Sequence, residues 1–91
     1  MVEYEDVVGL HAIGPDAMEA DLVAYCAAAE DWLTEHEGDE LSITVRPQRR
    51  GEIDGLFREG VPARHVWDQD EVERVRDLIC QAWDAWCSGE I

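Results

Sequence analysis

Residues 41–46 read Leu-Ser-Ile-Thr-Val-Arg, and apolar and polar side chains alternate strictly along them. Alternation with a period of two is typical of a β-strand that turns one face toward a core. We therefore predict a strand with Leu41, Ile43 and Val45 on its inner face. Pro47 ends it, because proline has no N–H group to donate to a sheet.

Two longer segments are predicted to be amphipathic helices. The first begins near Pro15, since proline suits the first helical position, and runs to about His36. The second begins after Asp68, which forms a D-x-x-E capping box with Glu71, and ends near Ser88. The predicted inner stripes are Met18, Leu22, Tyr25, Ala29, Trp32 and Leu33 on the first helix and Val72, Val75, Ile79, Ala82, Trp83 and Trp86 on the second.

A further strand is predicted at residues 5–13. Val8, Leu10 and Ala12 would share one of its faces, although Gly9 weakens a strand interior. This segment precedes the first helix and gives the sheet a second member.

The stretch 47–62 contains three glycines, two prolines and three arginines. We expect a long loop here, with at most one short turn at 53–57, and loops of this length are often functional. Residues 63–67 then read as a third, shorter strand. The whole order predicts an α+β fold: a small single domain over 1–91, with an about three-stranded antiparallel or mixed sheet and two amphipathic helices on one face (β-α-β-β-α).

The charge of the chain is strongly acidic and unevenly distributed. Asp and Glu number 22 against 7 basic residues, which gives a formal net charge of −15. Twelve carboxylates precede the first basic residue, Arg46, and five arginines then face three acids over 46–64. This distribution argues against direct contact with nucleic acid or anionic membrane and favours cationic partners.

Length and composition favour one soluble intracellular domain. A chain of 91 residues can bury roughly 60 to 65% of its unfolded surface, enough for a small core. No apolar run reaches the ~20 residues of a membrane span, and the N-terminus lacks the pattern of a secretory signal. The three cysteines are odd in number and have no C-x-x-C spacing, which argues against a disulfide framework. We therefore expect a cytoplasmic protein.

No motif in the sequence indicates catalysis, a cofactor or a metal. The candidate metal ligands are Cys26, Cys80, Cys87, His11, His36 and His65. Their spacings match no zinc pair, and we expect the thiols to be buried or half-buried like small apolar side chains. With 22 carboxylates, some pair lies at any chosen spacing by chance, so an acid/base couple has no support. A non-enzymatic protein is expected, with a small enzyme or a thiol-based sensor as a weaker alternative.

The four tryptophans divide into two groups. Trp32, Trp83 and Trp86 fall on the predicted inner stripes, so we expect them in the core. Trp67 belongs to no stripe and is the candidate for an exposed contact residue.

The carboxylates of the first helix are the best candidates for a binding surface. They occupy the face opposite the core stripe without an interleaved cation, so the helix lacks the ion pairs that a solvated face usually has. The predicted partner-binding residues are Asp16, Glu19, Glu30, Asp31, Glu35 and Glu37, supported by Glu73, Asp77 and Asp84 on the second helix and by Arg49 and Arg50 in the long loop. Carboxylates about one helical turn apart give a line of charge that a basic cleft can receive.

These features favour a small acidic inhibitor that blocks a basic, nucleic-acid-binding surface of a protein or of a larger complex. In size and charge the chain resembles anti-CRISPR and anti-restriction proteins of phages and bacteriocin immunity proteins, a likeness of properties without a shared motif. The alternative is a salt-adapted acidic structural or assembly subunit, which would need high salt to fold because its charges repel one another. Head-to-tail self-association through the arginine loop and the acidic helix also stays open.

Overall fold

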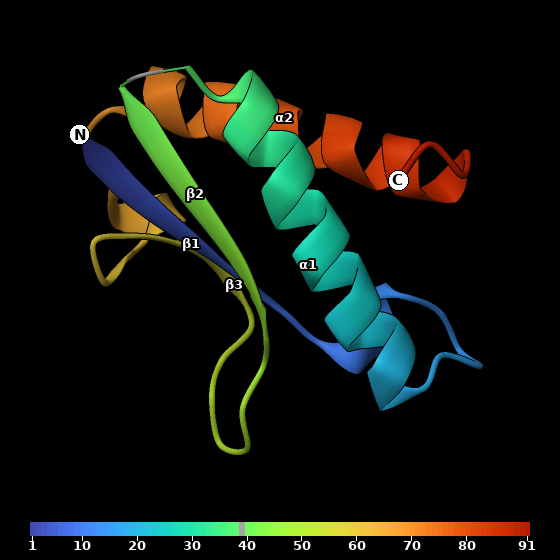
Figure 1. The fold of residues 1–91 in the computed structure, drawn as a ribbon. Coiled ribbons are helices and arrows are strands. Elements are labelled where there is room, and N and C mark those ends of the chain that lie inside the picture. Colours follow the sequence, from blue (N-terminus) through green and yellow to red (C-terminus); the bar gives the residue numbers. More distant parts are fainter. Residues whose placement is uncertain (39) are drawn as a thin grey trace.

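The computed structural model describes residues 1–38 and 40–91, which form two layers (Figure 1). A four-stranded mixed sheet is one layer, and helices α1 (Glu19–His36) and α2 (Gln69–Cys87) cover one of its faces. The predicted α+β class and the order strand, helix, strand, strand, helix are confirmed, and a fourth, two-residue strand is added. Asp39, one of the twelve carboxylates that precede Arg46, lies outside the described residues.

Strand β1 (Val2–Val8) lies inside the sheet, whose order is β2-β1-β3-β4. It pairs in parallel with β2 (Leu41–Pro47) and antiparallel with β3 (Gly55–Arg58). Because parallel neighbours require a crossover, α1 carries the chain from β1 to the start of β2. β2 is first in the strand order, so it is an edge strand of the sheet. Helix α1 runs alongside it (Figure 1). The predicted inner face of β2 is confirmed, since Leu41, Ile43 and Val45 are all buried.

A β-hairpin replaces the second half of the predicted loop at 47–62. β3 turns through Glu59 and Gly60 into β4 (Val61–Pro62), which pairs with it antiparallel. The φ angles of Glu59 and Gly60 are 49° and 86°, and two positive values in succession are characteristic of a type I′ hairpin turn. The irregular segment is thereby shortened to residues 48–54.

The segment 63–67 is not the predicted third strand. Residues Ala63–His65 form a short 3-10 helix, η2, directly after Pro62. Proline has no N–H group to extend the ladder, and the chain leaves the sheet after it.

The first strand lies closer to the N-terminus than predicted. It ends at Val8, and residues Leu10–Ala12 form the 3-10 helix η1. Gly9 stands at the break, where a Cβ atom would lie only 2.6 Å from Cε1 of His11 and the imidazole would have to move. The predicted strand through Leu10 and Ala12 is therefore wrong, and Leu10 is 42% exposed.

Helix α1 begins at Glu19 and not near Pro15. The Oδ2 atom of Asp21 accepts a hydrogen bond from the backbone N–H of Met18 (2.9 Å), which fixes the helix start there. Met18 consequently lies outside the core stripe, with 71% of its surface exposed. The start of α2 is as predicted: Asp68 Oδ1 accepts from the N–H of Glu71 at 3.1 Å.

The core lies between the sheet and the two helices. β1 contributes Tyr4 and Val8 to it. The predicted inward placement of the tryptophans is confirmed, since Trp32, Trp83 and Trp86 pack against the core, although each is only half-buried. The other buried members are Leu22, Tyr25, Cys26, Ala29, Leu33, Leu41, Ile43, Val45, Ala63, Val66, Val72, Val75 and Ala82.

Candidate binding surfaces

Two carboxylates of the predicted partner-binding face of α1 have structural partners in the sheet. Glu37 Oε2 accepts the backbone N–H of Ile43 at 2.9 Å, and Glu30 Oε1 accepts that of Val45 at 3.1 Å. The two glutamates are two helical turns apart and follow the open edge of β2. They satisfy N–H groups that would otherwise invite another strand to pair. Glu30 and Glu37 have no ion pair among the described residues, but each has a partner in the fold, because each accepts a backbone N–H of β2.

The remaining outer face of α1 is not a continuous row of carboxylates. Its N-terminal half exposes small apolar residues, namely Ala20, Val23, Ala24 and Ala27. Asp16 and Glu19 are exposed at or before the helix start, whereas Asp31 and Glu35 are exposed in its C-terminal half. The predicted acidic surface thus consists of two separate groups.

Where α2 crosses α1, the two helices are bordered by two grooves. One groove has a volume of about 460 Å³ and the other about 360 Å³. We name them together the helix seam, which is lined by His36, Glu37, Gly38, Glu40, Arg74, Asp77 and Leu78 in the first groove and by Trp32, Gln81, Asp84, Ala85, Ser88 and Glu90 in the second.

The helix seam is acidic, with five carboxylates and one guanidinium among its lining residues. The guanidinium of Arg74 lies 4.0 Å from Glu40, and both side chains are mostly exposed, so this ion pair is weak. Asp77 accepts a hydrogen bond from the amide of Gln81 at 2.9 Å. Asp77 and Asp84, which were predicted to support binding, therefore share a surface with Glu37, whereas Glu73 is exposed outside the two grooves.

An aromatic pair connects the two grooves of the helix seam. The rings of Trp32 and His36 stack with centroids 3.8 Å apart and an interplanar angle of 9°. His36 is fixed further by a 2.7 Å contact between its Nδ1 atom and the carbonyl oxygen of Trp32. Half-buried tryptophans of this kind are common anchors in protein interfaces.

The arginines predicted to form a basic loop have different roles. Arg46 pairs with Glu5 on β1 and with Glu52, and its hydrogen bonds lower the pKa of Glu52 to about 2. Arg58 pairs with Glu71 at 2.9 Å. Arg49 and Arg50 are exposed in the irregular segment, as a contact role would require.

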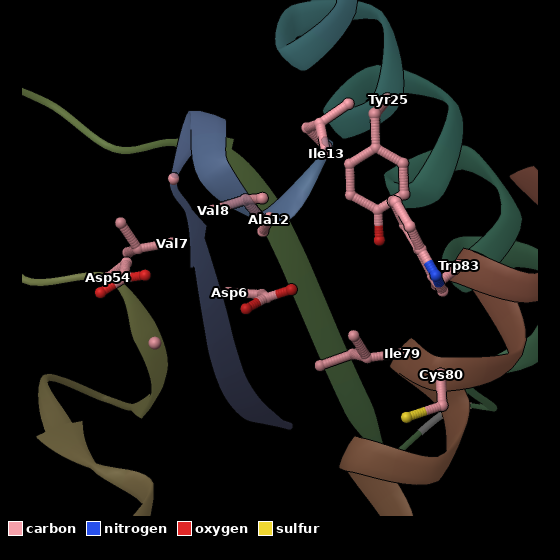
Figure 2. Close-up of a pocket in the computed structure, with 12 residues that line it drawn as sticks. Asp6, Val7, Val8, Ala12, Ile13, Tyr25, Asp54, Ile79, Cys80 and Trp83 are labelled. Carbon is pink, nitrogen blue, oxygen red and sulfur yellow. The ribbon is translucent and has the colours of Figure 1, made fainter. Parts of the chain in front are cut away.

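A third site, which the sequence did not reveal, is a cavity of about 320 Å³ at the C-terminal end of β1. Asp6 enters it from β1, Tyr25 from α1, and Ile79, Cys80 and Trp83 from α2 (Figure 2). The remaining lining residues are Val7, Val8, Gly9, Ala12, Ile13, Asp54 and Gly55. We name it the Asp6 cavity.

The carboxylate of Asp6 makes no hydrogen bond or ion pair with any residue in the described ranges. Burial and, to a smaller extent, the negative charge of Asp54 raise its pKa to about 6. Burial and the charge of Asp6 also raise the pKa of the Tyr25 hydroxyl, and burial raises that of the Cys26 thiol to about 11. The cavity therefore disfavours negative charge, and yet its only charged lining groups are the two acids.

Two aromatic rings form the wall of the cavity opposite Asp6. Tyr25 and Trp83 pack edge to face, with ring centroids 5.2 Å apart and an angle of 77°. Figure 2 shows the Tyr25 hydroxyl pointing into the space that the Asp6 carboxylate enters from the other side. Asp54 lies at the margin, where its Oδ2 atom pairs with Nε2 of His11 at 3.1 Å.

The cysteines differ in exposure. All three are free, and Cys26 is buried as expected, but Cys80 and Cys87 are exposed, so the prediction is wrong for these two. Cys80 is exposed at the margin of the Asp6 cavity, which it helps to line, and Cys87 is the last residue of α2. Across residues 1–38 and 40–91, no three His, Cys, Asp or Glu side chains gather as a group that could hold a metal ion. Trp67 is 96% exposed, which agrees with its predicted place outside the core.

In the described part of the chain, neither helix combines the length and the apolar character needed to cross a membrane. Comparison of the chain with protein-family models, with curated proteins and with solved structures gives no match. Functional inference therefore depends on the surfaces themselves.

Proposed function

We propose that this protein is a non-enzymatic, protein-binding inhibitor that uses the helix seam to block a basic surface of its partner. The observation that carries the proposal is the gathering of carboxylates from two helices along one pair of grooves, with Arg74 as the only cation among the lining residues. Such a surface attracts a cationic partner over several ångströms and would compete with a phosphate backbone for it.

The surroundings of the helix seam support this role. Asp31 and Glu35 lie on the neighbouring, C-terminal half of α1, are exposed, and have no hydrogen-bond or ion-pair partner among the described residues. They enlarge the acidic surface without serving the fold. Trp32 supplies a half-buried aromatic surface beside these charges. An aromatic anchor surrounded by unpaired charges combines apolar burial with electrostatic steering.

A matched pair of charge reversals tests the proposal. Asp77→Arg/Asp84→Arg changes two carboxylates of the helix seam, and Glu3→Arg/Glu59→Arg makes the same net change at exposed positions outside it. Each variant and the unaltered protein would be used to capture proteins from a lysate of the source organism at about 50 mM and 500 mM salt. The expected partner is a basic protein that the control variant retains, the seam variant loses, and high salt releases.

Binding to the purified partner then gives the quantitative result. We expect the seam variant to lose at least about tenfold in affinity and nucleic acid to compete with the unaltered protein. The proposal is wrong if no basic protein distinguishes the two variants, or if the captured protein binds both equally well. Circular dichroism of each variant would verify that its fold is retained.

A further inference from the structure

We infer that the Asp6 cavity is a binding site for a small organic cation, namely an ammonium group on a compact apolar body. The inference is independent of the proposed inhibitor role, because the cavity and the helix seam have no lining residue in common. It is carried by three observations: an open pocket of about 320 Å³, a carboxylate that enters it without a partner among the described residues, and aromatic rings opposite that carboxylate.

The volume and the lining suit a small ligand. About 320 Å³ is at the lower end of the ~300 to 1,000 Å³ typical of ligand pockets, and most of the wall is made of apolar side chains. Ala12 and Cys80, which are both exposed, mark its opening between η1 and α2. A ligand can therefore enter without displacing a helix.

The charges select the type of ligand. An anion would meet Asp6 and Asp54 and no cationic lining group, because His11, which pairs with Asp54, lies outside the lining. A neutral apolar molecule would leave the Asp6 carboxylate unpaired in a drier environment, which costs free energy. A divalent metal would need more oxygen or nitrogen ligands than two acids supply. An ammonium group pairs with Asp6 and relieves the cost of its burial.

The aromatic wall adds to the selectivity. An ammonium beside Asp6 would also lie near the rings of Tyr25 and Trp83, whose π-electrons attract cations. The Tyr25 hydroxyl points into the same space and can accept a hydrogen bond from an N–H group. Val8, Ile13 and Ile79 offer apolar contacts for the body of the ligand.

The experiment titrates the protein with 2-phenylethylammonium and with isobutylammonium, each beside its neutral alcohol, 2-phenylethanol or isobutanol. Calorimetry gives the dissociation constant, and the amide signals of Val8, Tyr25 and Ile79 in a ¹H–¹⁵N spectrum locate the site. We expect at least one amine to shift these signals and to bind at least about tenfold more tightly than its alcohol. The absence of shifts at about 10 mM of both amines overturns the inference.

Two further measurements assign the effect to Asp6. Asp6→Asn should weaken amine binding at least about tenfold, whereas Asp31→Asn, the same charge change on the outer face of α1, should leave it within twofold. The unaltered protein should also bind about tenfold more weakly at pH 5 than at pH 7.5, because only the ionised form of Asp6 pairs with an amine. The titratable groups around Asp6 are Asp54 beside β3, Tyr25 and Cys26 on α1, and Cys80 on α2. Equal affinity at both pH values, or in Asp6→Asn and Asp31→Asn, would contradict the assignment.

Discussion

Tyr4 and Asp6 lie two residues apart on the same face of β1. The carboxylate of Glu71, which bonds to Tyr4, and the carboxylate of Asp6 have opposite surroundings. Beside Tyr4, Oε1 of Glu71 accepts the tyrosine hydroxyl at 2.6 Å and Nε of Arg58 at 2.9 Å. Both donors lower the pKa of Glu71, and the hydrogen bond from the Tyr4 hydroxyl is the largest single cause. Asp6 has no donor among the described residues, and its pKa is raised to about 6. The fold thus stabilises the negative charge of Glu71, which reaches β1 from α2, and opposes that of Asp6 on β1 itself.

This difference shows which carboxylate belongs to the fold. A partly buried acid with two donors is a structural link, here between β1, β3 and α2. A partly buried acid without donors destabilises the fold at neutral pH, and the binding role proposed for Asp6 would account for an acid at this position. Removing each carboxylate should therefore change stability in opposite directions.

The largest effect is expected for Glu71→Ala. The substitution leaves the buried Tyr4 hydroxyl and the Arg58 guanidinium without their acceptor, and we expect a loss of about 2 to 3 kcal/mol in the free energy of unfolding at pH 7. Urea denaturation would measure it. Because the folded-state pKa of Glu71 is lowered, its contribution is present above the ordinary value of 4.5 and is lost as the pH falls below it.

Glu73→Ala is the matched control for Glu71→Ala. Glu73 is the next acid on α2, is exposed, and has no hydrogen-bond or ion-pair partner in the described residues. We expect its removal to change stability by less than about 0.5 kcal/mol. Equal losses in the two variants would mean that Glu71 acts only through helix charge and not through its two donors.

Asp6→Asn should have the opposite sign and a smaller size. A rise in pKa from 3.8 to about 6 corresponds to a destabilisation of the order of 3 kcal/mol for the ionised form. Asn is still a polar group without a partner, and some solvent reaches the site, so we expect a gain of about 1 to 2 kcal/mol at pH 7.5.

The pH dependence is the distinguishing part of this second prediction. Between pH 4 and 6 the folded unaltered protein holds the Asp6 proton more tightly than the unfolded chain, so its stability falls as the pH rises. The advantage of Asp6→Asn should therefore be small near pH 4 and complete above about pH 7. Thermal unfolding at both pH values would measure it, and an advantage that does not change with pH would show that Asp6 is not titrating in the cavity.

The parts of the fold that local chemistry determines were predictable from the sequence. The alternation over 41–46 and the cap at Asp68 depend on residues within a few positions, and both are confirmed. The hairpin was missed because Glu59 gives little indication of a positive φ angle, which is more usual for Gly, Asn or Asp. The segment's glycines and prolines suggested a loop instead.

The Asp6 cavity had no local signal of this kind. Asp6, Tyr25 and Trp83 come from three elements, and only the packing of both helices on β1 brings them together. The structural role of Glu30 was missed for a related reason. The helical periodicity placed it on a polar face, but nothing in the sequence indicated that this face borders the open edge of β2. In both cases the meaning of a carboxylate depends on a neighbour distant in the sequence.

The smallest effect is expected where a carboxylate binds backbone groups at the edge of the sheet. Glu30→Ala removes the acceptor for the Val45 N–H, and because water can partly replace it we expect a loss of only about 1 kcal/mol. Glu30→Gln keeps a side-chain oxygen at the same position and should lie within about 0.5 kcal/mol of the unaltered protein. Glu35→Ala, on the exposed side of α1, is the control for helix charge.

The same pair of variants tests whether Glu30 protects the edge of β2. If it does, Glu30→Ala should associate more readily than Glu35→Ala in light scattering, since unpaired N–H groups of an edge strand favour pairing between molecules. Equal stability and equal association of these two alanine variants would place Glu30 with the solvent-exposed acids, and not with Glu71 among the carboxylates that support the fold.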